Sequence, residues 1–351
     1  MKPTTSMSRL LALDYLRGFF IVVIIVDHLW RWPNIFELIS GRGELWASAA
    51  EGFVIISGLL IGYIRGYKNR KLPLLDVTKK LIKRGVILYV WMFITTTILV
   101  ALSWYLSYKG NLAYIPYNDY DWESLLVGML RLDYVHSLTH FLYLYAIFLV
   151  ISPLVIWLLR KSQAWIVAAL SIMLWLFGSA NAIEWMQWQL LFFIPAIAGY
   201  YLEPLRHFYN SLPHKTRNSL AYGSIAVTLA TIAISASIIL PAAPGTYDEV
   251  IFSREPLTAA RIIIAFVWFI GLFSLFELTQ RFLQRYFAWL LLPFGTKSLT
   301  AYILHALPLM ICSLLFASMD NIWINSLTAA ACILSTWALI KIPHINRIVP
   351  R

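Results

Sequence analysis

The chain has 351 residues, of which 60% are hydrophobic and 13% are charged. This composition excludes an ordinary soluble domain and predicts an all-α, polytopic transmembrane helical bundle. The net charge of +11 does not require a nucleic-acid partner, because basic cytoplasmic loops of a membrane protein produce the same excess.

Apolar runs long enough to cross a bilayer recur along the whole sequence. We expect about ten transmembrane helices in one integral membrane domain that covers residues 1–351. The runs at 164–179 and 187–203 are short for a full span. All the runs, in chain order, lie at about 13–31, 48–65, 85–107, 138–159, 164–179, 187–203, 219–240, 259–278, 296–318 and 322–340.

The distribution of Lys and Arg predicts how these helices are oriented. If the N-terminus is cytoplasmic, 22 of the 28 basic residues fall at the inner ends and loops, and six fall on the outer side. Cytoplasmic loops carry an excess of Lys and Arg, so this split predicts that both termini are cytoplasmic. In that orientation Arg17 lies near the inner end of the first helix, and His28 and Glu51 lie toward the outer half.

The first predicted helix carries ionisable groups that a plain membrane anchor would lack. A charge in a spanning helix costs a few kcal/mol or more and therefore indicates a functional site. Arg17 and His28 are eleven residues apart, which is roughly three turns plus 20°, so both project from one helix face with a rise of about 16 Å. Asp14 lies three residues before Arg17, within pairing distance on the same face. Glu51 opens the second apolar run.

A basic run precedes the third helix, and it has two interpretations. It is either an anchor that fixes topology or a seat for an anionic cytoplasmic donor, such as the phosphates of coenzyme A. The residues that we assign to donor binding are Lys80, Lys83 and Arg84, together with Arg17.

Three later residues are candidates for substrate contact. His136 and His140 are four apart at the start of the fourth helix, but zinc would need a third ligand and a general base, so we expect no metal site and assign His140 to substrate contact. Trp188 lies at the outer start of the predicted helix 187–203. His305 lies two turns after Ser298 on a late helix, where the alternative is a buried structural histidine.

Five segments occur in chain order, namely LDYLRGFFIVVIIVDH, AAEGFVIISG, KRGVILY, LYAIFLVISPLVIWLLR and WQLLFFIPAIAG. Together they resemble the OpgC-type branch of the acyltransferase-3 superfamily of membrane acyltransferases, named for succinylation of osmoregulated periplasmic glucans. The first segment matches the Arg-x10-His signature of that superfamily. The resemblance covers about residues 8–205 well and is looser in the last third, through FGTKSLTAYILH.

The resemblance implies a membrane O-acyltransferase of the bacterial cytoplasmic membrane. It would move a succinyl or acetyl group from cytoplasmic acyl-CoA to a hydroxyl of an extracytoplasmic glycan, with no bound cofactor. By position His28 would be the catalytic histidine, and Arg17 with Asp14 would be the motif arginine. Glu51 would line the same cavity and orient the imidazole or the acceptor. Pro195 departs from the branch, which leaves the acceptor open.

Other functions remain open from the residues alone. Buried Asp, Arg, His and Glu also suit the proton relay of a transporter or flippase for an envelope metabolite, although no inverted repeat is visible. A third alternative is a membrane sensor or assembly partner, in which the charged residues serve only as pairs that pack the helices together. We expect acyl-CoA, a glycan acceptor and membrane lipids as partners and no nucleic acid, and homo-oligomerisation stays open.

Overall fold

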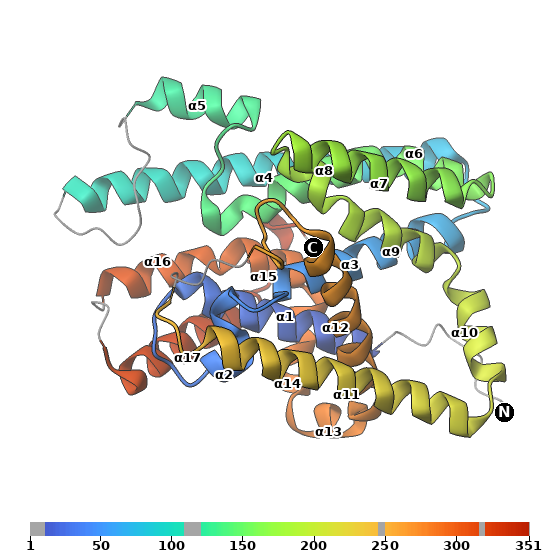
Figure 1. Cartoon of the computed structure of the whole chain (residues 1–351). Coiled ribbons are helices and arrows are strands. Elements are labelled where there is room, and N and C mark those ends of the chain that lie inside the picture. The colour runs from blue at the N-terminus through green and yellow to red at the C-terminus, as the bar shows by residue number, and fades with distance from the viewer. Residues whose placement is uncertain (1–10, 109–120, 245–249, 316–319, 351) are drawn as a thin grey trace.

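The computed structural model describes residues 11–108, 121–244, 250–315 and 320–350. The regular elements within these residues are helices (Figure 1). The longer ones are α1 (Leu11–Leu29), α3 (Ala49–Leu60), α4 (Leu74–Tyr108), α6 (His140–Arg160), α7 (Ala164–Ala180), α9 (Leu190–Tyr200), α11 (His214–Ile239), α12 (Ala259–Leu278), α16 (Ala306–Leu315) and α17 (Ile322–Leu339). The shorter ones are α2 (Glu37–Ser40), η1 (Gly41–Gly43), η2 (Ile61–Lys68), α5 (Trp122–Arg131), η3 (Ser137–Thr139), α8 (Glu184–Trp188), α10 (Leu202–Ser211), α13 (Gln280–Tyr286), α14 (Ala288–Thr296), α15 (Ser298–Leu304) and α18 (Ile345–Ile348).

Six helices of the described residues are long and apolar enough to cross a membrane, so the chain is a multi-pass membrane protein. The expected count of about ten is not confirmed, because several apolar runs divide into shorter helices. The run 296–318, for example, divides at His305 into α15 and α16. The sequence-based prediction missed α14, since nine apolar residues are too few to be recognised as a span.

α1 lies at the centre of one half of the bundle, where α3, α12, α14 and α17 pack around it (Figure 1). It is not among the six candidate spans, and it carries three ionisable side chains, Asp14, Arg17 and Asp27. Most of its apolar residues are buried. A helix that carries charge and is enclosed by other helices, rather than by lipid, is the arrangement that makes such charges tolerable in a membrane.

α3 joins the two halves of the bundle, because it contacts α1 on one side and α9 on the other. Its approach to α9 is at backbone distance: a Cβ on Gly58 would collide with the carbonyl oxygen of Phe192, and one on Gly62 with that of Ala196. Gly199 of α9 meets Leu59 in the same way. Small residues that allow backbones to approach are a common means of association between membrane helices.

Candidate functional site

A cavity lies where α1, α3, α6, α8 and α15 meet the turn formed by residues 250–258. Apolar side chains form much of its wall, and no carboxylate is among the described residues that line it. Its polar and aromatic lining residues include His28, Ser137, His140, Trp188, Arg254 and Tyr302. An apolar cavity with a few convergent polar groups is the usual form of a binding site for a small molecule.

His28 contacts a second histidine at this cavity. The Nδ1 atom of His28 lies 2.8 Å from Nε2 of His305. The other ring nitrogen of His305, Nδ1, contacts the carbonyl oxygen of Tyr302, which can only accept a hydrogen bond. Neutral His305 therefore carries its proton on Nδ1 and accepts at Nε2, so His28 donates from Nδ1. The basic lone pair of His28 is then on Nε2.

Tyr302 fixes this histidine pair to the rest of the bundle. Its hydroxyl oxygen accepts a hydrogen bond of 3.2 Å from the backbone N–H of Phe141, at the start of α6. Its ring packs edge-on to that of Phe141, with centroids 5.7 Å apart. His305, one turn later, is fully buried. The pair thus rests on contacts between α1, α6 and α15.

α1 and α15 also meet near the start of α1. Arg17 donates to the hydroxyl of Ser298 at 2.5 Å. Along α1, the earlier residue Arg17 therefore contacts Ser298 and the later residue His28 contacts His305. α15 and the start of α16 therefore run parallel to α1. The inference that Arg17 and His28 share a helix face, made from their spacing, agrees with both contacts.

A second arginine, Arg84, lies near Arg17, and a third, Arg65, lies near Arg84. Arg84 of α4 lies near enough to interact electrostatically with Arg17 and with Arg65, and Asp14 acts on Arg17 with the opposite sign. The Nε atoms of Arg17 and Arg84 are buried and have no hydrogen-bond partner within the described residues. This basic cluster, Arg17, Arg65 and Arg84, thus holds two buried donors without a partner within the described residues.

Lys80 and Lys83, which we assigned to donor binding with Arg84, are placed differently. Both are exposed at the start of α4 and form no hydrogen bond or ion pair within the part of the chain that is described. The structure therefore brings Arg84 to Arg17 but does not bring the two lysines into the same cluster.

His140 lines the cavity as part of a second polar group. Its Nε2 atom lies 2.6 Å from a carboxylate oxygen of Glu184, to which the hydroxyl of Tyr143 also donates at 2.6 Å. Although burial raises the pKa of Glu184, these two hydrogen bonds, with a contribution from Arg254, hold it below its ordinary value. Glu184 is therefore ionised at neutral pH and fixes His140 against α8.

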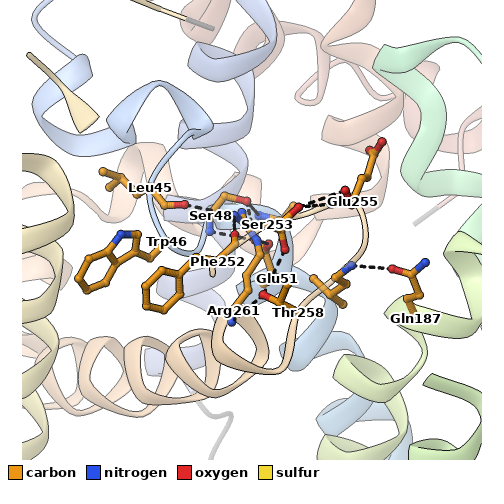
Figure 2. A network of polar contacts seen from close by, with 12 residues as sticks. Leu45, Trp46, Ser48, Glu51, Gln187, Phe252, Ser253, Glu255, Thr258 and Arg261 are labelled. Carbon is orange, nitrogen blue, oxygen red and sulfur yellow. Dashed lines mark hydrogen bonds and ion pairs between the residues drawn. The ribbon is translucent and has the colours of Figure 1, made fainter. Parts of the chain in front are cut away.

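Glu51 does not lie where the sequence led us to expect it. It is fully buried but does not line the cavity, and the partner of His28 is His305. Its carboxylate binds Nε of Arg261 at 2.6 Å and accepts from the backbone N–H of Ser48 at 2.9 Å (Figure 2). Both carboxylate oxygens of Glu51 are therefore engaged. One completes the capping box with Ser48 at the start of α3, and the other joins α3 to α12.

Two residues at or beside the cavity, Arg254 and Glu184, had no signal in the sequence. Arg254 is one of the six basic residues that the sequence predicts on the outer side, and its place above Trp188 depends on the fold of the 250–258 turn. Glu184 opens the short helix α8, 44 residues after its partner His140. The described residues contain no group of three His, Cys, Asp or Glu side chains that could hold a metal ion.

Fold and cavity together define a multi-pass helical membrane protein with a paired histidine at a largely apolar cavity inside the bundle. The family described as OpgC protein matches residues 9–344, so this chain belongs to the OpgC family. Membership indicates an acyltransferase-like role in the modification of glucans. Neither the curated proteins nor the solved structures include a match to the chain.

Proposed function

We propose that the protein is an O-acyltransferase of the bacterial cytoplasmic membrane. It moves an acyl group, succinyl or acetyl, from cytoplasmic acyl-CoA to a hydroxyl of an extracytoplasmic glycan. The observation that supports this most strongly is the contact of His28 with His305 at the cavity, because it gives His28 a defined tautomer with a basic Nε2. The OpgC family and the orientation predicted from Lys and Arg are consistent with it.

In this mechanism His28 is the general base. Its Nε2 takes the proton of the acceptor hydroxyl as the hydroxyl oxygen attacks the thioester carbonyl carbon. The tetrahedral intermediate collapses with cleavage of the carbon–sulfur bond, and the imidazolium returns the proton to the leaving thiolate. The products are an ester on the glycan and free coenzyme A. His305 accepts from Nδ1 of His28 and orients the ring, as the third member of a catalytic triad does.

Tyr302 is placed to stabilise the oxyanion of the intermediate. Its oxygen already accepts from the Phe141 N–H, and its own O–H hydrogen remains available to a group in the cavity. A fixed donor in a site that excludes water is worth more than the same donor in bulk solvent.

The donor would enter from the inner side, along α1. Arg17 and Arg84 have buried Nε–H groups without partners among the described residues, and phosphate groups satisfy such donors well. The rise from Arg17 to His28 is about 16 Å, a span that an extended pantetheine arm covers. Phe53 lies against both ends of this path, because its ring is 5.8 Å from the Arg17 guanidinium and also lines the cavity.

The test is an assay with purified protein, labelled succinyl-CoA and a β-glucan. We expect the wild type to place covalent label on the glucan, and His28→Ala to lower that rate by about 100- to 10,000-fold, the range of general-base catalysis. His207→Ala, at an exposed histidine of α10, is the matched control and should behave as wild type. Near-normal transfer by His28→Ala would refute the assignment. Uptake of a substrate without covalent transfer would favour a transporter instead.

A further inference from the structure

Arg254 is the one permanently charged side chain among the described residues that line the cavity. Its guanidinium carbon lies 5.4 Å from the centroid of the Trp188 ring. Stacking on an aromatic face restricts a guanidinium while its N–H donors stay available at the edges. The side chain is exposed, so a substrate group can reach it.

The turn that carries Arg254 is held by hydrogen bonds to two helices and by one within the turn. The N–H of Leu257 donates to the side-chain oxygen of Gln187 at 2.6 Å, and the hydroxyl of Thr258 donates to the carbonyl of Ile251 at 2.7 Å. Arg261 donates to the carbonyl of Phe252 at 3.0 Å (Figure 2). The first and third of these bonds come from α8 and α12, so the position of the turn is set by the bundle.

The buried Glu51–Arg261 pair belongs to the same network. The guanidinium of Arg261 contacts Glu51 through Nε and the carbonyl of Phe252 in the turn through one terminal nitrogen. Ionising two groups in a protein interior is costly unless further hydrogen bonds satisfy them, and here the turn supplies one. Glu51 is thus linked through Arg261 to the turn that carries Arg254.

No carboxylate in the described cavity lining neutralises Arg254. The charge of Arg254 acts on two carboxylates outside the lining, and both already have partners. Glu184 is bound by His140 and Tyr143, and Glu51 is bound by Arg261. A cavity with one fixed cation and no lining anion favours a ligand that brings a negative charge.

We propose that Arg254 binds the free carboxylate of a dicarboxylic acyl group and thereby makes the enzyme select succinyl over acetyl donors. This inference rests on the function proposed above. With the donor entering along α1 and its thioester at His28, the distal end of the acyl chain extends into the cavity that Arg254 lines. The carboxylate receives charge-assisted hydrogen bonds from the guanidinium. An acetyl group leaves the guanidinium without this partner.

The test compares kcat/KM for succinyl-CoA and for acetyl-CoA with a neutral glucan acceptor. In the wild type succinyl-CoA should be preferred. In Arg254→Gln the succinyl-to-acetyl ratio should fall by about 10- to 100-fold, as expected for loss of hydrogen bonds to a charged group. Arg254→Lys keeps the charge and should fall less. Arg131→Gln, at an exposed arginine of α5, should keep the wild-type ratio.

Two results would overturn the inference. One is a wild-type enzyme that does not prefer succinyl-CoA. The other is an equal loss with both donors in Arg254→Gln, which would mean that Arg254 serves the acceptor or the fold. A wild type that transfers neither group would instead contradict the proposed function itself, so the two failures are distinguishable.

Discussion

His305 determines which nitrogen of His28 is basic. Because the carbonyl of Tyr302 can only accept, it fixes the proton of neutral His305 on Nδ1, and that leaves Nε2 to accept from His28. Spacing alone predicted that Arg17 and His28 share a face, since helix geometry is local. It could not predict that Glu51 pairs with Arg261, because those residues are 210 positions apart in the chain.

At this scale we predict that His305→Ala lowers kcat by about 100-fold through loss of the His28 tautomer and orientation. The KM for acyl-CoA should change little, because His305 does not contact the proposed donor path. His305→Gln offers an amide oxygen to Nδ1 of His28 and should recover part of the rate. Steady-state kinetics of the three proteins measure this. A change in KM alone, or no recovery with Gln, would point to a structural role.

Helix packing, at the next scale, explains where the sequence-based prediction of elements succeeded and failed. Long apolar runs such as those of α6, α11 and α12 were recognisable, because an uninterrupted span has a length set by the bilayer. α14 was missed because it is a short helix whose place depends on α1: a Cβ on Gly18 would collide with the carbonyl of Leu291. Contacts of that kind are long-range and leave no periodic signal.

We predict opposite effects of one substitution at two glycines. Gly58→Ala should destabilise the protein by about 1–3 kcal/mol, because the new Cβ would meet the Phe192 backbone of α9. Gly223→Ala, on α11, meets nothing within 4 Å and should be neutral or stabilise by about 0.5–1 kcal/mol. Thermal unfolding in detergent compares them. Equal effects at both positions would mean that α3 and α9 are not packed at backbone distance.

The whole molecule places a basic cluster and a cavity at two positions along one central helix. Arg17 lies near the start of α1 and His28 near its end, and α15 follows α1 between them. The distribution of Lys and Arg predicts that the Arg17 end is cytoplasmic. The class of protein could be read from composition, and the family from five segments. The position of the 250–258 turn could not be predicted from the sequence, because it is set by contacts with helices that are distant in the chain.

Proteoliposomes with acyl-CoA sealed on the cytoplasmic side and a glucan only on the opposite side test the central claim most directly. The quantity measured is covalent label on the external glucan. If His28 serves a donor from within and an acceptor from outside, the wild type labels that glucan while His28→Ala does not. Labelling that requires donor and acceptor on the same side of the membrane would contradict the account.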